Sequence, residues 1–527
     1  MFFNRKKRIL RTLDSSFRYI KTEGFNFELI KRYFQGKNHE ESFQVLSDQT
    51  CEDLDFDLFF CYADRTSSKI GQQFLYNKMR TISHEAEKRL AQEKILEQLK
   101  KDPKSRLEIQ YQLQKLNNQE AYYLVDLFQQ EAEAKSKWHF VITLLSFTSF
   151  ASLLLSFFNP KLILLFFLVF AINTITHYAF KRRTNVFVNS MPSLFTLGSV
   201  ARKLTRYAFF QAENQKVAES LKVISSIQRK MSFFKLEQKT DSDMEAAYWF
   251  LLELIKITFL LEPLLMQSSI RNLQAKAKDI ENVYCYVGEI DSLLSVASLR
   301  SGLEEFCVPR IQEKSSRILG ENIKHPLIPA CIPNSLNENS SILLTGSNMS
   351  GKSTFIRSIG LNYIAGMSLN TCFASEMSLP VSKIFSLIRI SDDLMDASSY
   401  FFKEVDEMNH IIQYTGNTEN AIILLDELFK GTNTIERIAS AKAILSFLAK
   451  GKNHIFVSTH DIELTTMLQE EFALYHFSES IIDANIHFDY KLKKGTPKSG
   501  NAIRILELNN YPSAIIKEAQ EIAAKLK

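Results

Sequence analysis

Residues 341–354, SILLTGSNMSGKST, decide the fold of the last third of the chain. An apolar run from Ser341 to Thr345 leads directly into the pattern G-x-x-x-x-G-K-[ST], which begins at Gly346. The two glycines of this pattern let the backbone curl, so that successive N–H groups surround phosphate oxygens at the first turn of a helix. Because the run before the loop is strand-like and the residues after it are helix formers, the segment predicts a phosphate-binding loop in an α/β domain.

The loop also carries the side chains that a nucleoside triphosphate requires. Lys352 is predicted to be catalytic, placing a positive charge between the β- and γ-phosphates, and the Ser353 hydroxyl is a ligand for Mg²⁺. We therefore expect ATP and Mg²⁺ as the cofactors. The residues predicted to bind nucleotide in this loop are Gly346, Ser347, Asn348, Met349, Ser350, Gly351, Lys352, Ser353 and Thr354.

Two further apolar runs end in side chains that suit hydrolysis. Residues 421–427, AIILLDE, end in Asp426, predicted to hold magnesium through water, and Glu427, predicted to polarise the attacking water. Residues 454–461, HIFVSTHD, place His460 after another strand, where the imidazole can sense the γ-phosphate or orient the water. Ligands of open α/β sheets bind at the carboxyl ends of the strands, so we expect these ends to form one catalytic site.

The composition is that of a folded protein with more than one core. The chain has 527 residues, a hydrophobic fraction of 45% and a net charge of +5, so two to four units are expected and no overall field demands a polyanionic partner. The six cysteines are scattered without a C-x-x-C pair, which argues against a zinc site or a disulfide framework.

The first residues, MFFNRKKRILRTL, have neither the apolar region nor the cleavage site of a secretory signal. Their basic run, Arg5 to Arg8 beside Phe2 and Phe3, is typical either of a solvated basic tail or of a contact with anionic lipid or nucleic acid.

Two long runs in the middle of the chain lack any Asp, Glu, Lys or Arg. The first extends from His139 to Phe158 and the second from Leu162 to Phe180, and each is long enough to cross a bilayer as a helix. Asn159-Pro160 between them predicts a tight turn, hence an antiparallel membrane hairpin over residues 139–180. Lysines and arginines at both outer ends favour a cytoplasmic location for both ends, on the inner (cytoplasmic) membrane, although Lys161 in the turn counts against this topology. The alternative is a pair of helices buried in a soluble domain.

The chemistry-bearing segments together resemble the MutS family. TGSNMSGKST, DELFKGTNT (426–434) and STHDIELT (458–465) are similar to that family's P-loop, its DE-x-x-x-GT-x-T segment and its TH-x-x-ELT segment. SDDL (391–394) with SSYFFKEVDEM (398–408) resembles the family's signature segment, which reaches the partner's ATP across a dimer; by position Ser399 is the candidate. KHPLIP (324–329), which includes His325, and Asn334 resemble the residues that border the adenine.

The resemblance extends over most of the chain. ADRTSSKIGQQFLYNKMRT (63–81) is similar to the start of the family's helical core, and NNYPSAIIKEAQEIA (509–523) to its closing helical segment. The resemblance implies a P-loop NTPase of the ABC type joined to an all-α helical core and lever domain that carries the transmembrane hairpin. The expected units are a basic N-terminal segment (1–49), the first part of the core (50–137), the hairpin (138–180), the lever domain (181–320), the ATPase domain (321–508) and a C-terminal helical segment (509–527).

Several departures from the family bear on function. About 50 residues precede the core, too few for the domain with which mismatch-repair members read DNA, and FNFE (25–28) does not match its F-x-E motif. The hairpin stands where the family has its DNA-clamp insertion, and the chain stops at Lys527 without a nuclease domain. Phe429 and Lys430 replace the usual Gly-Arg pair. From these departures we expect no mismatch recognition.

Three functions stay open at this point. The first is a membrane-tethered ATPase that works as a homodimer and passes ATP-driven closure to its helical arms. The second is an ATPase that binds DNA through basic helical surfaces, in mismatch repair or in recognition of a DNA structure. The third is the energy subunit of a transporter, against which stands the lack of an LSGGQ-like signature.

Overall fold

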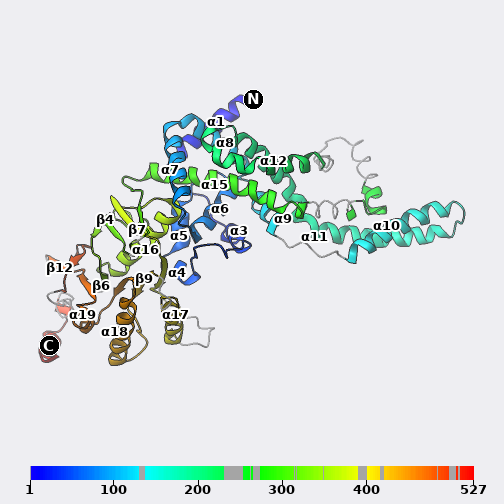
Figure 1. The fold of residues 1–527 in the computed structure, drawn as a ribbon. Helices are drawn as coiled ribbons and strands as arrows, with labels where there is room; N and C mark the ends of the chain where they lie inside the picture. The colour runs from blue at the N-terminus through cyan, green and yellow to red at the C-terminus, as the bar shows by residue number, and fades with distance from the viewer. Residues whose placement is uncertain are drawn as a thin grey trace.

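The computed structural model describes residues 2–129, 137–230, 253–261, 263–264, 273–313, 315, 317–347, 349–389, 400–415, 420–482, 485–497, 506–507 and 511–526. Figure 1 shows three parts: an α/β domain near the C-terminus, a helical body, and a long arm of two helices that projects away from both.

The α/β domain is built on a six-stranded sheet in the order β14-β11-β6-β10-β9-β8. Its five longer strands are parallel, and the short β14 is antiparallel at one edge. The predicted strands are present as β6 (Ser341–Thr345), β9 (Ala421–Asp426) and β10 (His454–Ser458), nearly all of whose residues are buried, as the continuous apolar runs require. The other strands are β8 (Lys383–Leu387), β11 (Phe472–His476) and β14 (Lys493–Lys494).

Helices cover this sheet, and two smaller sheets flank it (Figure 1). The covering helices are α16 (Lys352–Leu369), α17 (Tyr400–Thr415), α18 (Thr434–Lys450) and α19 (Ile462–Leu468), and the chain ends in α21 (Ser513–Leu526). One flanking sheet has the order β3-β7-β4-β5 and consists of β3 (Arg310–Gln312), β7 (Glu376–Pro380), β4 (Leu319–Ile323) and β5 (Asn334–Leu336). The other is the hairpin of β12 (Glu479–Ile482) and β13 (Asn485–Phe488).

The helical body combines segments from both sides of the arm. Its main helices are α1 (Phe2–Ser16), α4 (Asp48–Asp53), α5 (Phe56–Ala63), α6 (Lys69–Arg80), α7 (Ala86–Lys101), α8 (Pro103–Leu113), α9 (Asp126–Gln129), α12 (Gln211–Lys230) and α15 (Ala277–Gly302). Its short elements are α2 (Phe27–Ile30), α3 (Arg32–Gln35), β1 (Gln44–Val45), β2 (Thr81–Ile82) and three 3₁₀ turns, Gln114–Leu116, Gln119–Val125 and Ala208–Phe210. The basic α1 is part of this body, because Lys6 pairs with Glu108 on α8 at 2.9 Å.

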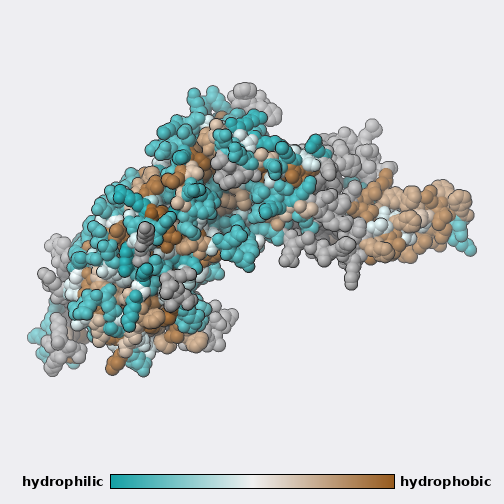
Figure 2. Space-filling view, viewed as in Figure 1, coloured by the Kyte–Doolittle hydropathy of each residue, from teal (hydrophilic) through white to brown (hydrophobic). Residues whose placement is uncertain are grey.

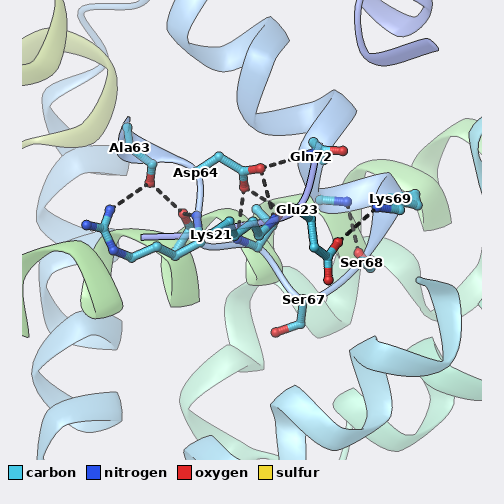
Figure 3. Close-up of polar contacts among 12 residues, drawn as sticks. Lys21, Glu23, Ala63, Asp64, Ser67, Ser68, Lys69 and Gln72 are labelled. Carbon is cyan, nitrogen blue, oxygen red and sulfur yellow. Dashed lines mark hydrogen bonds and ion pairs between the residues drawn. The ribbon is translucent and has the colours of Figure 1, made fainter. Parts of the chain in front are cut away.

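A cluster of polar contacts stabilises the loop between α5 and α6 (Figure 3). The buried carboxylate of Asp64 accepts hydrogen bonds from Lys21 Nζ at 2.9 Å and from Gln72 Nε2 at 2.6 Å. On α15, Asp291 accepts the backbone N–H groups of Ser67 and Ser68, both at 2.8 Å. These bonds give the family-like segment 63–81 a physical role, since they join α6 to the long helix α15.

The helical body and the ATPase sheet share one core. A continuous set of buried side chains runs from Phe17 through α15 to Ile342 and Phe477. At the junction the buried Asp53 accepts hydrogen bonds from Ser386 Oγ at 2.6 Å and from the backbone of Arg389 at 2.7 Å. The sheet and the helices are therefore packed against each other without a separate boundary layer.

The arm consists of α10 (Lys137–Ser156) and α11 (Leu162–Leu204), which pack against each other. Figure 2 shows it as a continuous hydrophobic projection, unlike the mixed surface of the rest of the molecule. Among the described residues, one stretch, Leu162–Ala179 of α11, has the length and apolarity needed to cross a membrane; the apolar part of α10, Phe140–Ser156, is shorter.

Candidate nucleotide site

The P-loop has the curled backbone that its glycines predict. Gly346 has φ +139° and Gly351 has φ +110°, and Met349 between them has φ +71°. At Gly346 a Cβ atom would lie only 2.6 Å from the carbonyl oxygen of Phe477, so both the angle and the space demand glycine. Gly351 ends the loop, and α16 begins at Lys352, which directs its first N–H groups toward the loop.

Lys352 is folded back on its own loop. Its Nζ donates to the carbonyl oxygens of Gly346 at 2.8 Å and Ser347 at 3.0 Å, and it lies 3.4 Å from His460 Nε2. Burial is the main cause that lowers the pKa of this lysine. The carbonyl oxygens occupy positions around the amine that phosphate oxygens would take, so the side chain is already poised for an anionic ligand.

The three predicted catalytic residues meet. His460 Nε2 lies 2.6 Å from Glu427 Oε1, and Glu427 has φ +52° with its N–H bonded to Ser458 O at 3.0 Å. The hydrogen bond from His460 is the largest cause that lowers the pKa of Glu427 to about 2. The carboxylate is therefore ionised and faces the amine of Lys352 across the imidazole.

The contacts of Phe429 and Lys430, which replace the usual Gly-Arg pair of the family, are visible in the structure. The Nζ of Lys430 lies 2.8 Å from Glu427 Oε2, so one carboxylate oxygen contacts this ammonium group and the other contacts the His460 ring. The neighbouring Phe429 is buried, has φ +59°, and donates its N–H to Glu404 of α17. The Phe-Lys pair thus fastens the loop after β9 to α17 and restrains Glu427. The contact between Glu427 and Lys430 depends on the conformation of the turn between them, so the pattern of residue types in the sequence does not indicate it.

Ser353 and Asp426 fit a magnesium site in their chemistry. Ser353 lines the cavity beside the P-loop, and Asp426 ends β9, where it accepts a hydrogen bond from Ser458 Oγ. A hydroxyl and a carboxylate are oxygen donors, and Mg²⁺ is commonly bound by one or two such groups together with waters and substrate phosphates. Among the described residues there is no cluster of three or more His, Cys, Asp or Glu side chains suited to a metal.

A cavity of about 940 Å³ extends from the P-loop toward β5 and β13. Its walls combine Ser347, Lys352 and Thr354 with Ile328, from the predicted segment 324–329, and with an apolar side that sequence reasoning missed: Cys331, Ile332, Phe477, Phe488 and Tyr490. An aromatic and aliphatic wall opposite a phosphate-binding loop suits a purine base. The signal in the sequence was weak, because residues 477–490 come from a hairpin that lies more than 120 positions after the loop.

The two predicted adenine-side residues differ in their placement. Asn334 lines the cavity, but its amide is used by the protein, donating to Tyr490 O at 2.9 Å and accepting from Leu492 N at 2.7 Å. It therefore holds Tyr490 over the cavity. His325 is not among the lining residues; burial lowers its pKa to about 4, and its Nδ1 accepts the N–H of Leu327 at 3.2 Å. Two further predicted residues, Asn348 and Ser399, lie outside the described residues.

Comparison with known proteins agrees with this site. Residues 342–527 match the family model described as MutS domain V. The DNA mismatch repair protein MutS of Petrotoga mobilis is 32% identical over 326 residues, which cover 59% of this chain and 39% of that protein. The protein of the same name from Clostridium perfringens is 29% identical over 277 residues (50% and 29%), and that from Listeria welshimeri is 32% identical over 277 residues (50% and 31%). The chain thus spans well under half the length of these curated relatives. With the P-loop, the acidic strand end and His460 assembled as described, these matches over the C-terminal part of the chain support its membership of the MutS family.

Proposed function

We propose that this chain binds and hydrolyses Mg-ATP at the P-loop, and that it does so as a membrane-tethered dimer. The observation that carries the ATPase activity is the meeting of Lys352, Glu427 and His460 at the ends of three different strands or loops. No sequence constraint other than a shared ligand brings an amine, a carboxylate and an imidazole to the mouth of a phosphate loop.

Binding begins with an exchange of partners at Lys352. The amine leaves the carbonyl oxygens of Gly346 and Ser347 and takes the phosphate oxygens, while the N–H groups at the start of α16 face the same anion. The apolar wall with Phe477 and Tyr490 receives the base. Ser353 and Asp426 are the residues that would hold Mg²⁺, which neutralises phosphate charge when bound.

Hydrolysis needs a water aligned on the γ-phosphate. Glu427 is the group that polarises this water, since its carboxylate is ionised and lies next to Lys352 through His460. His460 keeps the carboxylate oriented and lies close enough to Lys352 to respond when that amine moves. Release of Glu427 from Lys430 or from His460 is a natural step between binding and hydrolysis.

Dimerisation and membrane tethering complete the proposal. By resemblance, Ser399 reaches the ATP of a second copy, so closure of the two ATPase domains would accompany ATP binding. The arm supports the tether because its distribution of polar and apolar side chains is the reverse of that in a soluble helix pair. Asn173 is fully buried and His177 is 1% exposed, while Phe147 and Phe158 on the outside are 68% and 89% exposed. Polar groups inside and apolar groups outside are the arrangement that a bilayer favours.

The test of the ATPase assignment is Glu427→Gln. The amide keeps the shape but cannot act as a base, so hydrolysis should fall by roughly 10²- to 10⁴-fold while binding of a fluorescent ATP analogue stays near wild type. Glu470→Gln, at an exposed glutamate just after α19, is the matched control and should hydrolyse ATP normally. Wild-type turnover in Glu427→Gln would remove Glu427 from the mechanism.

A second candidate is DNA recognition, and it is favoured by the names of the relatives, which are DNA mismatch repair proteins. ATP turnover of detergent-purified protein, measured with plain, mismatched and branched duplexes, separates the two functions. Stimulation by mismatched or branched DNA, lost steeply as salt rises, would favour genome maintenance. Turnover indifferent to every DNA, together with flotation of the protein on lipid vesicles, would favour the membrane-tethered ATPase.

A further inference from the structure

A short helical segment from a distant part of the chain lies against the arm. Residues 253–258 form a helix that ends in a turn at 259–260, where Leu260 has φ +47°. Leu260 is fully buried although it lies in a turn. The ring of Phe259 meets the ring of Phe150 on α10, with centroids 6.1 Å apart.

The arm supplies the hydrogen bonds that this helix end lacks. A helix that stops leaves its last carbonyl oxygens without N–H partners. Here Asn173 Nδ2 on α11 donates to Thr258 O at 2.7 Å, and Ser146 Oγ on α10 donates to Phe259 O at 2.7 Å. Each helix of the arm thus provides one polar side chain, and the two side chains take consecutive carbonyl groups at the broken end.

Both polar side chains lie at the same level of the arm. Ser146 precedes the end of α10 by ten residues and Asn173 follows the start of α11 by eleven, so each lies roughly 15 to 17 Å from the tip. The hydrocarbon core of a bilayer is about 30 Å thick. If the arm spans the bilayer, the turn at Leu260 therefore lies close to its middle.

The charged residues of the segment lie nearer the helical body. Glu253 pairs with His177 of α11 at 3.4 Å and with Lys256 at 3.6 Å. His177 is one helical turn further from the tip than Asn173, on the side of the membrane surface. The segment thus has charges at its shallow end and the apolar residues Ile257, Leu260 and Leu261 at its deep end.

We propose that residues 253–261 belong to a third, re-entrant element of the membrane anchor, which enters the bilayer along the arm, turns at Leu260 and is surrounded by lipid and by α10 and α11. The inference rests on the proposed insertion of the arm. Irregular backbone at membrane depth is tolerated only where protein groups satisfy it, and Ser146 and Asn173 do so here. The chain continues from this element to α15, the long helix that meets the ATPase domain, so the element links nucleotide state to the bilayer.

The experiment uses depth-dependent quenching of tryptophan by brominated lipids. The chain has only two tryptophans, Trp138 and Trp249, which are replaced by phenylalanine in the full-length protein. Single tryptophans are then introduced, and each variant is reconstituted into lipid vesicles. The phosphatidylcholine of these vesicles carries bromine on its acyl chain, either near the methyl end or near the headgroup. Retained ATP hydrolysis identifies the variants that are folded.

Four positions report on the two proposals separately. Phe147→Trp on the outer face of α10 reports insertion of the arm, and Phe447→Trp on the exposed face of α18 is the control that stays outside the bilayer. Leu261→Trp reports the deep end of the re-entrant element and Ile255→Trp its shallow end. We expect the deep bromines to quench positions 147 and 261 alike, position 255 less, and position 447 not at all.

The outcomes are distinct. Quenching at 147 without quenching at 261 or 255 would overturn the re-entrant element and leave the tether intact. No quenching at 147 would overturn the tether itself and, with it, this inference. In the Leu261→Trp protein, Ser146→Ala with Asn173→Leu should reduce deep quenching at least by half, whereas Thr148→Val, which removes a bond within α10 alone, should not.

Discussion

The catalytic carboxylate is held from both sides, and removal of one partner gives a sharp test of the site. Lys430 Nζ lies 2.8 Å from one oxygen of Glu427, and His460 Nε2 lies 2.6 Å from the other. Lys430→Met keeps the aliphatic stem and removes the charge. We expect the variant to hydrolyse ATP faster than the wild type, because Glu427 becomes a stronger base and is released from one restraint.

The size of the effect follows from the contacts. The hydrogen bond from His460, with a further one from Lys430, lowers the pKa of Glu427 from 4.5 to about 2. This depression corresponds to about 3 kcal/mol in favour of the ionised carboxylate. The side chain of Lys430 is 48% exposed, and a pair so open to water contributes no more than about 1 kcal/mol. If half of this contribution reaches the barrier for proton transfer, kcat rises roughly two-fold.

The assay is steady-state phosphate release at saturating ATP and neutral pH. Lys430→Arg keeps the charge and should behave as wild type, and Lys452→Met removes an exposed lysine outside the described site and should have no effect. A fall in kcat toward the roughly hundred-fold loss seen when a transition-state donor is removed would refute the reasoning. Lys430 would then stabilise charge on the reacting phosphate instead of restraining the base.

Three further predictions concern the base pocket and the helical body. Tyr490→Ala removes a wall of the cavity and should raise KM for ATP roughly five-fold with kcat unchanged, whereas a fall in kcat alone would place Tyr490 in the chemistry. Gly71→Ala puts a Cβ atom 2.1 Å from a carboxylate oxygen of Asp291 and should destabilise the protein by about 1–3 kcal/mol in denaturant unfolding, while Gly24→Ala, with no atom within 4 Å, should be neutral. Burial raises the pKa of Asp291 to about 6 from 3.8, so its protonated form is favoured by folding and its contribution to stability is lost as the pH rises from about 4 to 6. The difference in unfolding temperature between wild type and Asp291→Asn should change across that window in favour of the wild type at the acidic end, and a constant difference would contradict the burial argument.

Most of the six-stranded sheet could be predicted from the sequence. The apolar runs at 341–345, 421–425 and 454–458 are buried parallel strands, because a strand covered on both faces must be apolar at every position. The P-loop could be predicted equally well, because its backbone requires positive φ angles at positions 346 and 351 and both residues are glycines. The flanking sheet β3-β7-β4-β5 was not predicted, because its strands are short and β7 pairs with β3 and β4 across more than fifty residues of intervening chain.

The sequence by itself determined which groups we propose for the chemistry of this protein. Lys352, Glu427 and His460 could be named from their positions after strands, since local backbone geometry and strand polarity fix where such residues emerge. Only the tertiary structure decided what surrounds them. It placed Lys430 on Glu427, turned the amide of Asn334 toward the protein, set His325 outside the cavity, and brought residues 253–260 against the arm. Contacts of this kind join side chains that are far apart in sequence or that meet across a strained turn, and no local pattern of residue types records them.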